Sequence, residues 1–171
     1  MSIEHSTSEV LPPVEVSSSP MQRLEEYLQM RGQRMTAQRR SMVEQIFDRH
    51  DHFDADALIE QLRQSDVFKG TVSQATVYRT LDLLVESGLL NRFQLDGRSV
   101  YEHDYGYPQH DHLYCTKCRE LFEFHSDEIS RIRDIVAAEQ GFKVSGHRMI
   151  IQGVCQTCSK KKRQRRRHDL V

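Results

Sequence analysis

The stretch SQATVYRTLDLLVESGLLNRFQLDGRSVYE, residues 73–102, changes from a helical to a strand-like hydrophobic period. Ser73 can cap a helix with apolar side chains at i, i+4 and i+7, and Gly88 follows the end of that helix. Beyond Gly88 the apolar residues alternate, and the pair Asp96-Gly97 separates two alternating runs, which predicts a β-hairpin. We therefore expect a helix followed directly by a hairpin.

The polar face of this helix carries an unusual combination of side chains. At about 100° per residue, Ala75, Arg79 and Asp82 lie opposite the apolar stripe, and Tyr78 lies on a flank. An aromatic ring, a guanidinium and a small residue are thus presented together. This combination suits a recognition helix that contacts DNA.

Three shorter apolar stripes precede the helix. Pro20 stands at a favourable first helical position, Gly32 can end that helix, and Thr36 and Asp54 can cap the next two. Three helices, a recognition-like helix and a hairpin predict a winged helix-turn-helix domain over residues 21–103. The alternative is a generic small α+β domain, because the same order also serves as a plain packing unit.

A second, smaller α/β domain is expected over residues 104–159, after a Tyr-, Gly- and Pro-containing hinge. HLYC and ELFEF predict short strands, Ser126 can cap a helix that runs to Gly141, and residues 142–155 predict one or two strands. Such a unit has little core of its own, so zinc and dimerisation are expected to stabilise it. The predicted fold class is α+β.

The net charge of −1 conceals an asymmetry, because residues 160–167 hold seven basic side chains and the remainder of the chain sums to −8. Residues 1–20, rich in Ser, Pro and acidic side chains, predict a disordered arm, and residues 160–171 predict a basic disordered tail. The tail has no specific role or adds sequence-independent affinity for phosphates. The chain has neither an apolar run of about 18 residues nor a secretory signal, so we expect a soluble cytoplasmic protein.

Four cysteines form two CxxC pairs, at Cys115 and Cys118 and at Cys155 and Cys158. Paired thiolates at this spacing predict a four-coordinate structural zinc site with no open position for water. Buried or redox-active cysteines are the alternative.

Histidines just ahead of the first pair offer a second ligand chemistry. His110 and His112 share a face if the segment is extended, while Asp111 points elsewhere. They are either ligands of one ion or solvated loop histidines. Further candidate ligands are His50, His52, Glu102 and Glu123. Their spacing in the sequence does not show whether they meet at one site.

Several motifs together resemble the ferric uptake regulator family of bacterial metal-responsive repressors. They are TAQRR, HDHFDADAL, SQATVYRTLDLL, GRSVYE, HDHLYCTKC, LFEF and SGHRMIIQGVCQTC. The resemblance covers residues 21–158, and its ATVYRTL and HDHLxCxxC elements are specific to that family. It implies a non-enzymatic homodimer with a winged-helix DNA-binding domain, a dimerisation domain and double-stranded operator DNA as partner.

The resemblance also implies two metal sites. The structural zinc site of the family is matched by Cys115, Cys118, Cys155 and Cys158. Its regulatory site, which bridges the two domains, is matched by His52, Glu102, His110, His112 and Glu123. Three nitrogens and two carboxylates accept Fe(II), for which Mn(II), Co(II) or Zn(II) can substitute. A zinc-, manganese- or peroxide-sensing relative is the alternative, although peroxide sensors typically have aspartates at positions 102 and 123 and zinc sensors often recruit an additional cysteine.

A further metal site of the family is only partly matched. Asp111 and His147 stand at two of its positions, but Gln109 and Ser130 occupy places where a histidine and a glutamate are usual. A weak additional metal site at Asp111 and His147 is therefore the most that we expect, and His147 is alternatively a satisfied core histidine.

For DNA binding, the resemblance implies that Tyr78 contacts bases and that Arg79 holds a phosphate. Arg34 corresponds to a basic residue that enters the minor groove of A/T-rich palindromic operators. Arg39 and Arg40 either contact phosphates or merely solvate their helix. The rival from another class is a metal-dependent hydrolase built on the histidines, for which the sequence offers neither a nucleophile nor a phosphate-binding loop.

Overall fold

The computed structural model describes residues 14–48, 52–68 and 72–160, which fall into two compact units that divide between Pro108 and Gln109. We predicted the division after residue 103. The structure places it later because Tyr105 and Gly106 contact residues 14–18 of the first unit. The basic tail lies outside the described residues apart from Lys160.

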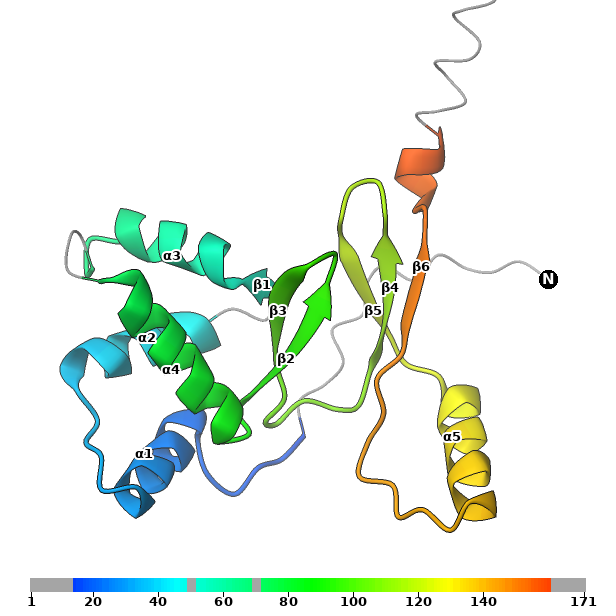
Figure 1. Cartoon of the computed structure of the whole chain (residues 1–171), viewed down its shortest axis with the longest axis horizontal. Coiled ribbons are helices and arrows are strands. Elements are labelled where there is room, and N and C mark those ends of the chain that lie inside the picture. Colours follow the sequence, from blue (N-terminus) through cyan, green and yellow to red (C-terminus); the bar gives the residue numbers. More distant parts are fainter. Residues whose placement is uncertain (1–13, 49–51, 69–71, 161–171) are drawn as a thin grey trace, which may run out of the picture. The chain divides into compact units, whose positions relative to one another are not determined.

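Within the described residues, the first unit contains four helices and a small antiparallel sheet (Figure 1). The helices are α1 (Pro20–Met30), α2 (Ala37–Phe47), α3 (Ala55–Gln64) and α4 (Gln74–Glu86). The strands are β1 (Phe53–Asp54), β2 (Leu90–Leu95) and β3 (Arg98–His103), in the order β1-β3-β2. This confirms the winged helix-turn-helix fold.

Side-chain caps set where these helices begin. Thr36, Asp54 and Ser73 each accept a hydrogen bond from the backbone N–H three residues later, as predicted. Ser19 caps α1 in a reciprocal capping box with Gln22. Satisfying these otherwise unpaired N–H groups fixes the first turn of each helix.

At the other end of α4, Gly88 adopts a φ of 69°, and the N–H of Leu89 bonds the carbonyl of Leu84. This Schellman-type ending turns the chain directly into β2.

The core of the first unit is built from one face of each helix. Leu24, Leu28, Met42, Leu62 and Leu81 are completely buried. Residues at i, i+4 and i+7 of α4 face this core, so its opposite side is left exposed. The apolar stripe thereby orients the candidate recognition surface outward.

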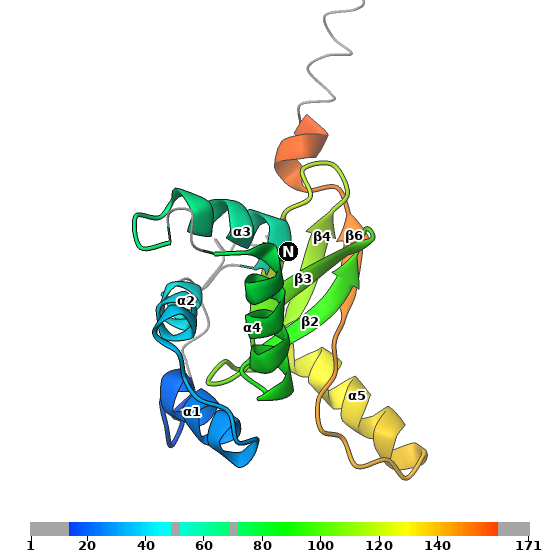
Figure 2. The same cartoon turned by 60° about the vertical axis from the view of Figure 1, so that its left-hand side comes forward.

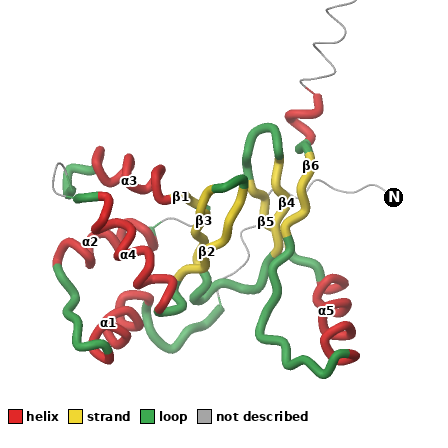
Figure 3. Tube along the Cα trace, viewed as in Figure 1, coloured by secondary structure: helices red, strands yellow, loops and turns green. Residues whose placement is uncertain are grey.

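The wing hairpin forms as the sequence predicts. Leu95 pairs with Arg98, and Asp96 and Gly97 between them have φ values of 49° and 75°. Positive φ at both central residues is the conformation of a type I′ turn. The sequence did not reveal β1, a strand of two residues that pairs with β3 (Figure 3).

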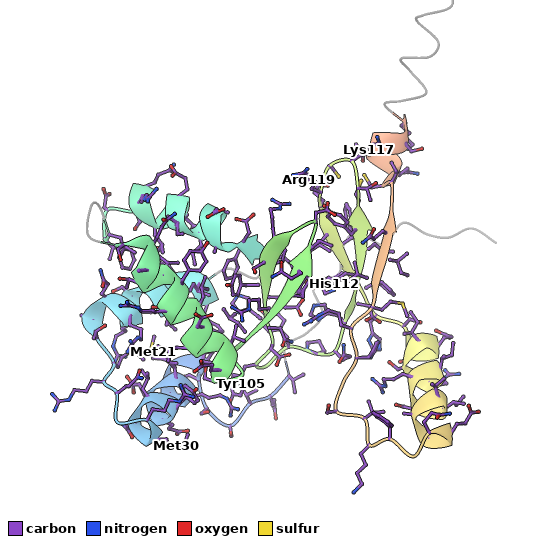
Figure 4. All side chains as sticks on the ribbon, in the orientation of Figure 1. Met21, Met30, Tyr105, His112, Lys117 and Arg119 are labelled. Atoms are coloured by element: carbon purple, nitrogen blue, oxygen red, sulfur yellow. The ribbon has the colours of Figure 1, made fainter. Side chains whose placement is uncertain are left out.

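Residues 14–19 differ from the disordered arm predicted over residues 1–20, of which residues 1–13 lie outside the described part of the chain. The N–H of Val14 donates to the carbonyl of Gly106 at 2.8 Å, and the hydroxyls of Ser18 and Tyr105 lie 3.0 Å apart. Figure 4 labels Tyr105, whose ring also lies 4.8 Å from the guanidinium carbon of Arg23. These long-range contacts order the segment without any local periodicity.

In the part of the chain that the structure describes, the second unit contains a three-stranded sheet, one longer helix and a short helical segment over residues 156–160 (Figure 1 and Figure 2). Its elements are β4 (Asp111–Cys115), β5 (Leu121–Phe124), α5 (Asp127–Glu139) and β6 (Ile150–Gly153). The strand order is β5-β4-β6, and β4 pairs with β6 in parallel. The segment 142–155 thus contributes one strand.

The apolar side of α5 is left open within the single chain. Ile132, Ile135 and Val136 are 61%, 58% and 54% exposed. Over the described part of the chain, α5 therefore keeps an apolar stripe whose side chains are more than half exposed. Among the described residues, no helix combines the length and apolarity that a membrane span requires.

Candidate metal centres and nucleic-acid interface

The four cysteines converge at one end of the second unit's sheet. Cys115 ends β4 and pairs in parallel register with Gly153 of β6, two residues before Cys155. The four sulfur atoms all lie within 4.8 Å of one another, and those of Cys118 and Cys155 are 3.8 Å apart. The turn that contains the first pair carries Lys117 and Arg119, labelled in Figure 4. Parallel pairing of two distant strands thus assembles the cluster.

Hydrogen bonds at this cluster favour a thiolate at one cysteine. Backbone N–H groups of Cys118 and Cys155 lower the pKa of Cys115 to about 6. At Cys118 the Glu120 N–H favours the thiolate, but burial and the neighbouring thiols raise its pKa to about 12. A divalent cation would compensate the negative charge and allow all four sulfurs to ionise together.

One histidine–carboxylate pair lies in the first unit. The Nε2 atom of His52 lies 3.3 Å from a carboxylate oxygen of Glu102. Pairing of Phe53 with Tyr101 explains the proximity, because it sets the preceding residue opposite Glu102. The strand that the sequence did not reveal therefore positions this candidate ligand pair.

A second group of candidate ligands lies in the second unit. The rings of His110 and His112 are 4.9 Å apart between centroids, and His110 Nε2 is 3.9 Å from a carboxylate oxygen of Glu123. His112, labelled in Figure 4, pairs directly with Glu123 across β4 and β5. The predicted sharing of a face by these histidines is consistent with this arrangement.

Asp111 makes different contacts. Its Oδ2 atom lies 3.0 Å from Nε2 of His147, and its Oδ1 atom accepts the N–H of Met149 at 2.9 Å. The side-chain amide of Gln109 donates to the carbonyl of His147 at 2.8 Å. The two residues of the predicted weak site are therefore adjacent, within a network of hydrogen bonds.

The exposed side of α4 presents Tyr78 and Arg79. Tyr78 is 41% exposed, which is sufficient for a ring to contact a partner. Across the described residues, no carboxylate lies in salt-bridge contact with Arg79 or with Arg34. Both guanidinium groups are available to an anionic partner.

Other arginines of the first unit are engaged. Arg40 forms a salt bridge with Glu25 of α1, and Arg92 of the wing forms one with Asp82 at 2.9 Å. Arg39 donates to the carbonyl of Arg34 at 2.8 Å. Arg39 is thereby placed to hold the loop that carries Arg34, a role that sequence spacing did not indicate.

This chain combines a winged helix that exposes aromatic and guanidinium groups with a thiol cluster and imidazole–carboxylate groups. That combination characterises metal-responsive DNA-binding regulators as a class. Residues 30–152 match the model of the ferric uptake regulator family, to which this chain belongs. Members of that family are transcription regulators, which points away from the hydrolase alternative.

Individual relatives agree with this assignment. The ferric uptake regulation protein of Neisseria gonorrhoeae is 35% identical over 133 residues, which cover 76% of this chain and 89% of that protein. A structure of the ferric uptake regulator of Francisella tularensis with iron is 27% identical, with a TM-score of 0.64 over 75% of this chain and 96% of that one. A zinc-bound manganese uptake regulator is 37% identical, with a TM-score of 0.57 over 77% and 98%.

Replacing Cys115 by serine is expected to remove about one zinc equivalent per chain, because three thiolates cannot complete the tetrahedral shell. The thermal unfolding midpoint should fall with the lost zinc. Lys117→Ser, an exposed change in the same turn, is the matched control. Elemental analysis of the purified variants would contradict the assignment if both kept equal zinc.

Proposed function

We propose that this chain is an iron-responsive transcriptional repressor, in which Fe(II) joins the two units and sets the dimer geometry for binding A/T-rich palindromic operators. The observation that carries the proposal is the pairing of imidazole with carboxylate inside each unit, at His52 and Glu102 and at His110 and Glu123. Each unit offers a partial ligand set of the same chemistry.

The proposed regulatory ligands supply three imidazole nitrogens and two carboxylates. They are His52, Glu102, His110, His112 and Glu123. The first unit contributes one imidazole and one carboxylate, which is too few to hold Fe(II) tightly. An ion that needs ligands from both units binds best when they adopt one particular arrangement. Metal binding then shifts the population toward that arrangement.

The four cysteines are proposed to hold a structural zinc. Four thiolates fill a tetrahedral shell and leave no position for water or substrate. Their convergence within 4.8 Å supports this role. The zinc stabilises the second unit and takes no part in sensing.

A homodimer is proposed to form through the second unit. The apolar stripe of α5 is exposed, and β6 stands at an edge of its sheet. Beside the stripe lies an apolar hollow of about 500 Å³ that Phe142 and Met149 help to line. A second copy that covers these surfaces would supply the core that this small unit otherwise lacks.

DNA recognition is proposed to use α4 and the loop before α2. Tyr78 packs on base edges, Arg79 holds a phosphate, and Arg34 enters the minor groove. The bond from Arg39 to the carbonyl of Arg34 supports a role for Arg39 in holding that loop. The salt bridge between Arg40 and Glu25 already satisfies that guanidinium and so favours the alternative in which Arg40 does not contact phosphate.

Repression then follows from symmetry. A two-fold dimer must match half-sites about one helical turn, or a multiple, apart, so the spacing of its paired recognition helices controls operator affinity. The metal-loaded dimer binds and represses, and the metal-free form releases the operator.

A manganese-responsive regulator is the second candidate, because a zinc-bound manganese uptake regulator is 37% identical to this chain. The ligand types accept both Fe(II) and Mn(II). Anaerobic titration of Fe(II), Mn(II) and Zn(II) at buffered free concentrations, with operator binding as the readout, separates the candidates. Induction by Mn(II) alone within the physiological range would replace iron in the proposal.

Charge removal at the proposed regulatory ligands is expected to weaken metal-induced operator binding. Glu102→Gln and Glu123→Gln keep side-chain size and should each weaken the metal response by more than about tenfold. Glu60→Gln, on the exposed side of α3, should leave it unchanged. Fluorescence anisotropy with a labelled operator measures the response, and retention of zinc shows that folding is intact. Equal responses in all three variants would contradict the assigned ligands.

A matched pair of arginine variants tests the recognition surface. Arg79→Ala should weaken binding to all duplexes and reduce the slope of log K against log salt concentration by about 0.9, because one phosphate contact is lost. Arg40→Ala removes an arginine that is already paired with Glu25 and should leave the slope unchanged. Binding isotherms at several salt concentrations decide between them, and a reversed pattern would relocate the phosphate contact to α2.

The dimer surface predicts a change of assembly state. Ile135→Glu places a carboxylate in the apolar stripe and should raise the dimer dissociation constant by more than about tenfold. Arg131→Glu introduces the same group elsewhere on α5 as the control. Analytical ultracentrifugation measures both, and an unchanged dimer in Ile135→Glu would place the interface on another surface.

A further inference from the structure

The contacts of Asp111 and His147 extend to a third side chain, Arg133 of α5. The Nη1 atom of Arg133 lies 3.2 Å from Nδ1 of His147, whose Nε2 atom lies 3.0 Å from Asp111 Oδ2. The side chain of Asp111 is only 4% exposed and that of His147 16%. A guanidinium, an imidazole and a buried carboxylate thus form a continuous chain.

The hydrogen-bonding capacity of these groups fixes the direction of the chain. A guanidinium only donates, so Nδ1 of His147 accepts from Arg133. The proton of the neutral ring is therefore on Nε2 and is donated to Asp111 Oδ2. The other oxygen of Asp111 accepts from the N–H of Met149 at 2.9 Å. Both ring nitrogens and both carboxylate oxygens are engaged.

We propose that the guanidinium of Arg133 takes the place of a divalent cation beside Asp111 and His147, so that this locus is held together without metal. A cation bound between the imidazole and the carboxylate would have to displace the Nε2 proton and would stand near a permanent positive charge. The residues at the other two positions of the family's site, Gln109 and Ser130, add no anionic ligand. Gln109 directs its amide N–H groups to the carbonyls of His147 and His110, and Ser130 offers only a hydroxyl.

Arg133 is itself held in place. Its Nε atom donates to Asp134 Oδ1 at 2.8 Å, while Nη1 reaches His147. The planar fork of a guanidinium satisfies both directions at once, which a lysine ammonium does not reproduce. The Asp134 hydrogen bond, with a smaller contribution from the charge of Asp111, raises the pKa of Arg133.

The network ties together three segments of the second unit. Arg133 belongs to α5, Asp111 begins β4, and His147 and Met149 lie in the segment that leads into β6. Since this tie needs no ion, its formation is independent of the metal supply. Metal-dependent changes in the protein are then confined to the zinc cluster and to the proposed regulatory ligands.

Metal counting tests this inference separately from DNA binding. Zinc-loaded full-length protein, His147→Gln and Arg131→Ala are dialysed against buffered Co(II), and bound cobalt per chain is measured by elemental analysis. We expect equal cobalt in all three proteins. Loss of about one cobalt equivalent in His147→Gln alone would overturn the inference, whether or not the regulatory site binds metal.

Stability measurements test the structural role of the guanidinium. With weakly held metals removed and zinc retained, Arg133→Ala should lower the thermal unfolding midpoint by about 2 to 4 °C, the shift for a loss of about 1 kcal/mol in a chain of this length. Arg133→Lys keeps the charge without the fork and should show a smaller loss. Arg131→Ala, an exposed arginine on the same helix, should match the unmodified protein. Equal midpoints for Arg133→Ala and Arg131→Ala would overturn the proposal.

Discussion

Side chains on β4 alternate between the two faces of its sheet, and this alternation separates chemistries that are neighbours in sequence. His112 pairs across the sheet with Glu123, whereas Asp111 meets His147 and Met149. The end of the same strand delivers Cys115 to the thiol cluster, since β6 runs parallel to it. A slip of β4 by one residue would exchange the two faces and disrupt all three arrangements together. Register in this five-residue strand is thus the condition for the metal chemistry of the second unit.

Features with a local chemical cause could be predicted from the sequence. Thr36, Asp54 and Ser73 cap helices because each hydroxyl or carboxylate satisfies a nearby N–H. The turn at Asp96-Gly97 forms because positive φ suits those residues. The CxxC spacing likewise predicted a cysteine cluster, and the structure brings all four sulfurs together. In each case the signal and the structure it specifies lie within a few residues, or repeat a known ligand spacing.

Features that depend on distant contacts could not be predicted in the same way. The two-residue strand β1 exists only through its pairing with β3, yet it positions His52 beside Glu102. Residues 14–19 carry no hydrophobic period and are ordered by Gly106 and Tyr105. Arg133 carries no local signal of its role, because nothing in its spacing reveals His147, fourteen residues later, as its neighbour. The signal in each case is tertiary and has no counterpart in local spacing.

Tyr105 has a consequence for how the ends of the first unit are held. Its hydroxyl is held by Ser18 and its ring by Arg23, so the residues that enter α1 and those that follow β3 are fastened to each other. The hydrogen bond between the N–H of Val14 and the carbonyl of Gly106 extends this contact along the backbone. The same few contacts therefore protect both described ends of this unit from fraying, and loosening one end would loosen the other.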